Sequence, residues 1–414
     1  MPLPKFLQTL RNIRGRTPVE NPLAIIAPDK FKGTLTAAEA TKEMRSAVTE
    51  IIPDAQVLEC PMADGGEGTA EIIARHLGLT ECTIAGHDAL MNETCIRFFS
   101  DSETCAVDCA SIVGLAMLGQ TPLQPWQSTS FGVGEFLCAM LKRGMKKIFI
   151  GIGGTASIDG GAGLLQALGA KFFDVEGEQI KARPIRAHHL STIYSVDFSA
   201  IPRQPLKQHV IALADVDLPL IPPSPGEMSS LSFAIQKGIS PHEMPKLHKA
   251  LENFNTAVDN AIYAPTEPPR FQGAGGGIGY ALHRVLHCNC KSGAEFITSV
   301  YELPSILGNA SPATRFILTG EGSFDAQSFQ GKATGTILQI AKQHNTPVIV
   351  VAGKTEYPSD NTEITSGVRI ISTSEYLPPN SEINHNTALA ALKTALHNKL
   401  PLILQKISTH TKNR

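Results

Sequence analysis

Residues 147–168 read KIFIGIGGTASIDGGAGLLQAL, and this stretch decides the fold class. Its β-rich start, residues 147–150, ends directly in glycines, which is the pattern of a buried strand that stops at a turn. The glycine-rich loop of residues 151–163 then opens into a helix-compatible segment, residues 161–168. A strand, a glycine loop and a helix in direct succession form the repeating unit of α/β proteins.

The same alternation recurs along the chain. Runs rich in β-forming residues that end in turn residues predict buried strands at 23–27, 147–150, 210–214, 316–318 and 347–351. Helix-compatible stretches between them are 37–51, 134–143, 161–168, 244–264 and 332–343. We therefore predict an α/β fold with a largely parallel sheet, and the length of 414 residues favours two domains.

Composition narrows the class of partner. Hydrophobic residues make up 42% of the chain and charged residues 18%, which indicates a globular protein with a sizeable core. The formal charge of -2 provides no broad field for nucleic acid or an anionic membrane, so the expected partner is a small molecule. No apolar run approaches the roughly 18 residues that span a bilayer, and we expect a cytoplasmic protein. Residues 1–22 are basic, with apolar spacing typical of a short amphipathic helix, and are interpreted as an extension.

The eight cysteines show neither zinc-site nor redox CxxC spacing, so reduced thiols are expected.

Acids stand among glycines in the segment 61–69, PMADGGEGT. Glycines let the backbone approach a ligand closely, and the carboxylates of Asp64 and Glu67 could hold a metal beside a phosphate. The alternative is an ordinary tight turn whose acids are solvated.

The loop 151–163 allows two interpretations. Phosphate could bind at the N-terminus of the helix that it opens. Gly151, Gly153 and Ala156 also fit the GxGxxA fingerprint of dinucleotide-binding folds, with Asp174 at the distance of a ribose-binding acid. We favour the first interpretation because the glycine run is longer than that fingerprint and contains Asp159 where the phosphate turn would be.

Further polar residues follow predicted strands. The segment 319–325, TGEGSFD, is followed by Gly331 and Lys332 at a helix start, where a cation could meet phosphate or could be a solvated cap. It is not a P-loop, because Ala326 occupies the place of the first glycine. Asp215 and Asp217 follow the strand 210–214 and could form a paired metal site or two solvated acids. The glycines of 273–279 suit close helix packing or ligand contact equally well.

Taken together, these segments resemble a known family. They are IAPD at 26–29 with Lys32, ADGGEGT at 63–69, the loop 153–163, and TGEG at 319–322 with Asp325, Gln327, Gly331 and Lys332. In this order and spacing, the chain resembles the bacterial glycerate kinases of the type that makes 2-phospho-D-glycerate. The resemblance runs from about Leu23 to the last helix.

The resemblance implies two different α/β domains with the active site in the cleft between them. One would be flavodoxin-like and built from residues 23–82 and 295–405, and the other, residues 83–294, would be inserted into it. It also implies transfer of the ATP γ-phosphoryl group to the 2-hydroxyl of D-glycerate, with Mg²⁺ bridging phosphate oxygens. The oligomeric state is left open, with a homodimer among the options.

We assign roles to residues as hypotheses on this basis. Lys32, Asp215 and Lys332 are the catalytic candidates, and Asp64, Asp159 and Asp325 are the metal ligands. The nucleotide-binding candidates are Gly65, Gly66, Gly153, Gly154, Thr155, Gly320 and Gly322. The substrate-binding candidates are Asp29, Ser130, Gly275 and Gly276.

Four residues depart from the family pattern: Leu218, Ile158, Phe131 and Ala234. They fall in segments expected to face the substrate, which keeps three alternatives open. These are a kinase for another small hydroxy acid, a family member that binds metabolites without catalysis, and an NAD(P)-dependent oxidoreductase that uses the loop 151–156.

Overall fold

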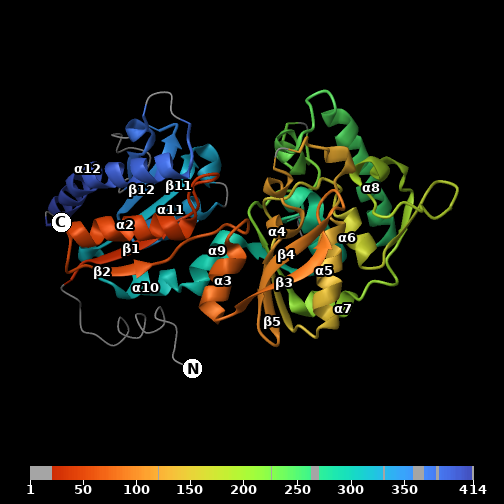
Figure 1. The fold of residues 1–414 in the computed structure, drawn as a ribbon, viewed down its shortest axis with the longest axis horizontal. Helices are drawn as coiled ribbons and strands as arrows, with labels where there is room; N and C mark the ends of the chain where they lie inside the picture. Colours follow the sequence, from red (N-terminus) through yellow and green to blue (C-terminus); the bar gives the residue numbers. More distant parts are fainter. Residues whose placement is uncertain are drawn as a thin grey trace. The chain divides into compact units, whose positions relative to one another are not determined.

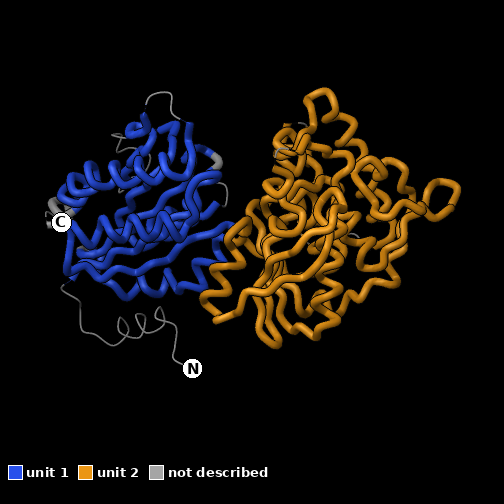
Figure 2. Tube along the Cα trace, viewed as in Figure 1, with its two compact units in different colours: residues 1–64, 294–414 blue, residues 65–293 orange. Residues whose placement is uncertain are grey.

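The computed structural model describes residues 21–119, 121–224, 226–262, 270–329, 332–357, 368–378 and 382–412. The chain divides into two compact units, coloured separately in Figure 2. Unit 1 comprises Met1–Asp64 and Ala294–Arg414, and unit 2 comprises Gly65–Gly293. Nearly all of the expected N-terminal extension lies outside the described residues.

Unit 1 is a parallel five-stranded sheet with helices (Figure 1). Its sheet order is β13-β12-β11-β1-β2, which is the flavodoxin-like order 2-1-3-4-5 when the strands of the unit are counted along the chain. The flavodoxin-like prediction is therefore confirmed. Its strands are β1 (Leu23–Pro28), β2 (Gln56–Glu59), β11 (Arg315–Phe324), β12 (Val348–Thr355) and β13 (Val368–Ser372). Its helices are α2 (Ala37–Ile51), α9 (Gly293–Val300), α10 (Leu303–Asn309), α11 (Ala333–Gln343) and α12 (His385–Lys412).

The core of unit 1 explains why its strands read as continuous apolar runs. Every residue of β1 is buried, because the strand lies between β11 and β2. On one face of the sheet, Ile26 and Leu318 pack with apolar residues of α2 and α12, among them Met44 and Leu396. Burial of these side chains stabilises the unit.

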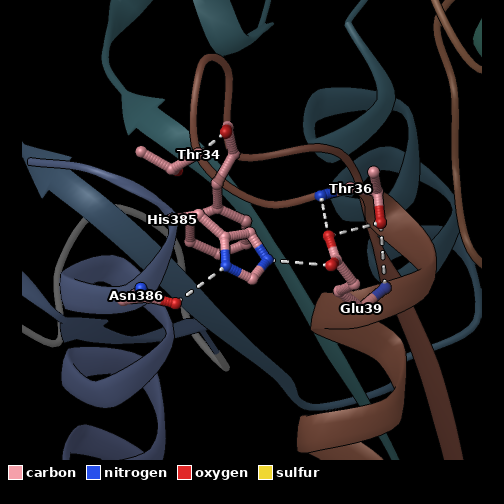
Figure 3. A network of polar contacts seen from close by, with 6 residues as sticks. Thr34, Thr36, Glu39, His385 and Asn386 are labelled. Atoms are coloured by element: carbon pink, nitrogen blue, oxygen red, sulfur yellow. Dashed lines mark hydrogen bonds and ion pairs between the residues drawn. The ribbon is translucent and has the colours of Figure 1, made fainter.

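Polar contacts join the start of α2 to the start of α12. The hydroxyl of Thr36 accepts the N–H of Glu39 at 3.2 Å, and the Glu39 carboxylate accepts the N–H of Thr36 at 2.9 Å, which is a capping box. His385 points at the same carboxylate in Figure 3, with its Nε2 2.9 Å from Oε1. The bond from the Thr36 backbone, followed by that from His385, lowers the pKa of Glu39 to about 2. The helix that follows the first strand is thus held at its N-terminus.

Unit 2 contains a six-stranded mixed sheet in the order β10-β9-β6-β5-β4-β3 and a separate two-stranded antiparallel sheet of β7 and β8. Strands β5, β6, β9 and β10 are parallel, and β3 and β4 form an antiparallel hairpin at one edge. Its strands are β3 (Thr80–His87), β4 (Glu93–Ser100), β5 (Thr104–Asp108), β6 (Lys147–Gly151), β7 (Lys171–Phe173), β8 (Ser195–Asp197), β9 (Val210–Ala214) and β10 (Asn289–Ser292). Its α-helices are α3 (Thr69–Leu77), α4 (Ala110–Val113), α5 (Phe131–Lys142), α6 (Ala162–Ala167), α7 (Arg203–His209) and α8 (Met244–Ala261).

Short helical turns complete unit 2. The 3₁₀ turns used below are η2 (Pro125–Gln127), η3 (Ala187–Thr192), η5 (Ile235–Lys237) and η6 (Ala274–Gly277), and η7 (Tyr280–Val285) is a π-helix.

The structure moves one predicted domain boundary. The units divide at Asp64/Gly65, whereas the sequence suggested residues 82/83. The reason is α3, which contacts β4, β5 and β6 and therefore packs with the sheet of unit 2. The division at Gly293/Ala294 lies within one residue of the expected position.

Two simpler expectations concern cysteines and membranes. All eight cysteines are free thiols, as predicted. Among the described residues, no helix combines the length and the apolar character that are needed to cross a bilayer.

Candidate active site

The sheet order of unit 1 reverses between β1 and β11, and polar residues follow both strands there. In open α/β sheets, ligands bind outside the carboxyl ends of the strands at this switch point. The N–H of Asp29, directly after β1, donates to the carbonyl oxygen of Gly320 in β11 at 2.8 Å. The predicted residues Asp29 and Gly320 are therefore brought together at the position where this fold binds ligands.

Three carboxylates interact at this end of the sheet. Asp29 is almost fully buried, and burial raises its pKa to about 7, with Asp64 and Glu321 contributing further in the same direction. Lys30 opposes the rise, and its Nζ lies 3.6 Å from Oδ1 of Asp64. A bound cation would offset the cost of keeping these buried carboxylates ionised.

Glu321 extends the acidic group along β11. Its side chain is buried, and burial raises its pKa, whereas the Ser328 and Thr334 side chains, followed by Lys332, lower it. Within the part of the chain that the structure describes, Oε1 of Glu321 has no hydrogen-bond partner. An orphaned, buried carboxylate oxygen fits a site that receives a cation or a hydrogen-bond donor from a ligand.

Lys32 and Gly322 lie beside this acidic group. A Cβ at Gly322 would lie 3.0 Å from the backbone nitrogen of Lys32, so the loop after β1 runs against β11 at this point. The Lys32 residue itself is exposed and Lys332 is half-buried. No three His, Cys, Asp or Glu side chains of the described ranges come together as a complete protein-made metal site. Mg²⁺ commonly binds one or two carboxylates together with substrate phosphates, and these acids can supply the carboxylates.

In unit 2, the loop before α3 is held by an aspartate at the end of β5. Asp108 is buried, and its carboxylate accepts the N–H groups of Gly68 at 2.9 Å and Ala70 at 3.0 Å. A Cβ at Gly65, where φ is +104°, would lie 2.6 Å from the carbonyl oxygen of Leu213. Only glycine fits so close to the neighbouring strand. The predicted glycine loop is therefore a rigid part of this unit.

The second glycine loop meets Asp215 and a buried lysine. A Cβ at Gly153 would lie 2.8 Å from Oδ2 of Asp215, which follows β9. Lys237, at the end of η5, is almost fully buried and donates to the Thr155 hydroxyl at 3.2 Å and to the Ser157 carbonyl oxygen at 2.8 Å. Burial lowers the pKa of Lys237 to about 8, while Asp215 and Asp159 act in the opposite direction.

The predicted glycines of 273–279 belong to the same group. A Cβ at Gly276 would lie 2.8 Å from Nζ of Lys237, and one at Gly275 would lie 2.5 Å from the carbonyl oxygen of Ile152. Unit 2 therefore gathers Gly65, Asp215 and Lys237 with three glycine-rich segments. An anion or hydroxyl held here would meet both a carboxylate and an ammonium group.

Asp159 and Ser130 have a different role from the predicted one. Asp159 is fully buried and accepts four hydrogen bonds, from the Ser130 N–H and hydroxyl and the Gly161 and Gly163 N–H groups. The Thr129 hydroxyl shares its proton between Asp159 at 3.2 Å and the Ile185 carbonyl oxygen at 2.8 Å. The Ser130 hydroxyl also accepts the N–H of Leu164 at 2.9 Å. These bonds organise the loop, so we do not retain Asp159 as a metal ligand or Ser130 as a substrate contact.

The same network corrects the expected phosphate site at the start of α6. The Gly161, Gly163 and Leu164 N–H groups already donate to Asp159 and Ser130, so an internal carboxylate occupies the place of a ligand anion. The N–H of Gly153 is also engaged, with the carbonyl oxygen of Gly65 at 3.0 Å. These N–H groups are therefore not available to ATP, whereas Gly154 and Thr155 stay predicted nucleotide-binding residues.

The dinucleotide-binding alternative is not supported by the geometry. Asp174 lies in a turn directly after β7, where its carboxylate accepts the N–H groups of Glu176 and Glu178. Because β7 pairs antiparallel with β8 outside the main sheet, the GxGxxA segment does not open the βαβ unit that this fingerprint requires. Of the two acids after β9, Asp217 pairs with Arg270 at 2.6 Å, and a metal site shared with Asp215 stays a prediction.

Three of the four departures from the family pattern lie in the core. Phe131, Ile158 and Ala234 are buried, and Leu218 is half-buried. The buried side chains contribute to the packing of unit 2, and the expectation that their segments face the substrate stays a prediction.

Four polar residues of these sites were not among the predicted site residues: Lys30, Asp108, Lys237 and Glu321. Glu321 belongs to the segment 319–325 and Lys30 directly follows Asp29, so both could have been chosen because they follow predicted strands. Asp108 ends β5, a strand that was not among those predicted from the sequence, so its position gave little indication of a role. Lys237 comes from a segment 80 residues beyond Ser157, and only the fold brings the two together.

The whole chain compares with known proteins as follows. A family model described as the glycerate kinase family matches residues 24–400. The glycerate 2-kinase of Escherichia coli K12 is 34% identical over 333 residues, which cover 80% of this chain and 84% of that protein. The glycerate kinase of Bacillus subtilis 168 is 31% identical over 334 residues, with 80% and 84% covered.

A solved structure agrees with this match. The crystal structure of a glycerate kinase 2 from Salmonella typhimurium LT2 superposes with a TM-score of 0.71 at 28% identity, covering 94% of this chain and 99% of that chain. A family model that spans most of the chain and relatives above 30% identity agree on one assignment. The chain belongs to the glycerate kinase family.

Proposed function

We propose that this chain is an ATP-dependent glycerate 2-kinase. It transfers the γ-phosphoryl group of ATP to the 2-hydroxyl of D-glycerate and releases ADP and 2-phospho-D-glycerate. Family membership over residues 24–400 is the observation that carries the proposal. The relative from Escherichia coli is named for the same reaction class.

In unit 1, we assign Asp29, Asp64 and Glu321 to a Mg²⁺ ion that accompanies ATP. The raised pKa of Asp29 and the Oε1 of Glu321 that has no hydrogen-bond partner support this assignment. A cation would lower the pKa of Asp29 and would bind this oxygen of Glu321. When bound, Mg²⁺ neutralises phosphate oxygens. Lys32 and Lys332 remain candidates for contacts with phosphate, and Asp325 remains a predicted metal ligand.

In unit 2, we assign Asp215 to the glycerate hydroxyl. A carboxylate can orient the attacking hydroxyl and accept its proton as the O–P bond forms. Lys237 would hold Asp215 and the loop around Thr155 in position through its charge and its hydrogen bonds. The expected cleft between the two domains stays a prediction.

The experiment is a kinase assay with product analysis. Purified protein is incubated with ATP, Mg²⁺ and D-glycerate, ADP is quantified, and the product is identified by ³¹P and ¹³C NMR. Coupling of phosphorus to C2 is the expected result. Release of ADP with other hydroxy acids but not with D-glycerate would replace glycerate by another substrate of the same class.

Two controls separate the remaining alternatives. Asp215→Asn should lower kcat by roughly 100-fold or more while the melting temperature stays close to that of the wild type. Asp217→Asn is the matched control and should retain activity, since Asp217 is paired with Arg270. ATP binding without turnover on any acid would identify a non-catalytic member of the family and overturn the proposal, as would NAD(P)H binding without ATP use.

A further inference from the structure

Unit 2 contains a cavity of about 740 Å³ that is separate from the residues grouped around Asp215. Four basic side chains line it: Arg183, Arg186, His188 and His189. The remaining lining residues are uncharged, among them Asn92 and Gln124. The volume lies in the range of small-molecule sites, roughly 300–1,000 Å³.

The two arginines of this cavity lack acidic partners. Among the described residues, neither guanidinium group forms an ion pair. The Arg183 guanidinium lies over the ring of Phe131 at 5.5 Å, and Arg186 donates one hydrogen bond to the carbonyl oxygen of Gln127. Each guanidinium has five N–H donors, so both retain donors for a ligand.

One of the two histidines presents a further donor. Their rings lie 3.8 Å apart. Nδ1 of His189 accepts the backbone N–H of Arg186 at 3.1 Å, so the neutral ring carries its proton on Nε2. Nδ1 of His188 faces the carbonyl oxygen of Trp126 at 2.8 Å and must donate to it. Burial, followed by the neighbouring His188 and Arg186, lowers the pKa of His189 to about 4, so at neutral pH this ring is a neutral donor.

The segment that carries these side chains is anchored from both sides. The side-chain amide of Gln166 bonds to the Ala182 carbonyl oxygen at 2.8 Å and accepts the Ile185 N–H at 2.7 Å. The Thr129 hydroxyl donates to the Ile185 carbonyl oxygen at 2.8 Å. The basic side chains therefore project from a fixed backbone, which lowers the ordering cost of binding.

Arg183 is exposed and Arg186 is half-buried, so a dissolved anion can reach both guanidinium groups. Guanidinium groups form strong, charge-assisted hydrogen bonds to carboxylate and phosphate oxygens. We propose that this cavity binds a small multivalent oxyanion, a phosphorylated or polycarboxylate metabolite, through Arg183 and Arg186 with Nε2–H of His189 as an additional donor. The site does not depend on the assignment of the kinase reaction.

Calorimetric titration of the full-length protein tests this site, with pyrophosphate and citrate as separate probes in the absence of ATP and Mg²⁺. The variant Arg183→Gln/Arg186→Gln should bind the preferred probe about tenfold more weakly for each guanidinium removed. Arg97→Gln is the matched control, because Arg97 is an exposed arginine of the same unit that pairs with Glu81 at 2.8 Å. It should bind like the wild type.

A second measurement follows probe binding by the wild-type protein, and variants serve only to assign its signals. Ring ¹H–¹⁵N signals of His188 and His189, assigned with the variants His188→Gln and His189→Gln, should shift when the probe is added. Preference for pyrophosphate identifies a phosphorylated ligand, and preference for citrate identifies a polycarboxylate. Equal affinity of the wild type and the double arginine variant, or unchanged ring signals with both probes, would overturn the proposal.

Discussion

Nζ of Lys237 donates a hydrogen bond of 2.8 Å to the main-chain carbonyl oxygen of Ser157, although the two residues are 80 positions apart. The lysine is almost fully buried, and its charge also interacts with Asp215 and Asp159. One side chain thus connects the loop after β6 with the acid after β9. This connection leads to the first of four predictions.

Replacing Lys237 by methionine keeps much of its volume and removes its charge and both hydrogen bonds. We expect kcat/KM for glycerate to fall by roughly 100-fold, because the loop around Thr155 and the Asp215 carboxylate lose their shared partner. Steady-state kinetics and circular dichroism would measure the change. Lys249→Met, at an exposed position of α8, is the control and should leave kcat/KM unchanged. Unaltered kinetics in a folded Lys237→Met protein would remove Lys237 from the site.

The buried carboxyl of Asp29 makes stability depend on pH. Its pKa is raised from 3.8 to about 7, so between these values the folded protein retains a proton that the unfolded chain has released. This group therefore lowers the free energy of unfolding as the pH rises from about 4 to about 7. Asp29→Asn should be more stable than the wild type at pH 8 and no more stable at pH 4, as measured by urea unfolding without divalent metal.

Magnesium provides the check on this prediction. Mg²⁺ should raise the melting temperature of the wild type at pH 8 and have a smaller effect on Asp29→Asn. Asp54→Asn, at an exposed position of the same unit, should behave like the wild type in both measurements. Identical pH profiles for Asp29→Asn and the wild type would contradict the assigned burial of the carboxyl group.

Asp108→Asn tests the anchor of the first glycine loop. An amide has one carbonyl oxygen, so it cannot replace both acceptors used by the N–H groups of Gly68 and Ala70. The expected cost is about 1–3 kcal/mol in the free energy of unfolding. Hydrogen exchange should accelerate at Gly68 and Ala70 in particular. A uniform acceleration across unit 2 would instead indicate general destabilisation.

The N-terminus of α2 offers a smaller stability test. Thr36→Ala removes the hydroxyl of the capping box and should cost about 1 kcal/mol in the free energy of unfolding. Thr49→Ala on the same helix removes an exposed hydroxyl that donates only to the Arg45 carbonyl oxygen and should have a much smaller effect. Thermal unfolding would compare the two variants. Equal losses would mean that the cap at Thr36 contributes nothing specific.

Local sequence predicted much of the fold correctly. The helix of residues 37–51 has the same bounds as α2, and the strand of residues 210–214 has the same bounds as β9. Strand β11 is longer than predicted, because glycines and acids that resemble a turn in the sequence pair with β12 as far as Phe324. Tertiary pairing overrides the weak β-propensity of these residues.

The candidate site was less predictable. Asp159 and Asp215 both follow a strand near glycines, and the sequence provides no basis for separating them. In the structure, donors from residues 129–130 and 161–163 surround Asp159, whereas Asp215 lies against Gly153 and interacts with Lys237. Whether such a carboxylate already has hydrogen-bond donors depends on segments that are distant in the chain.

The sequence by itself determined the fold class, the location of polar loops at strand ends and the resemblance to a kinase family, because periodicity, turn residues and motif spacing are local properties. The tertiary structure alone decided which acids are buried, which are already hydrogen-bonded, and where Lys237, Arg183 and Arg186 lie. Desolvation and charge interactions act through space, so they depend on neighbours that folding brings together from separate segments.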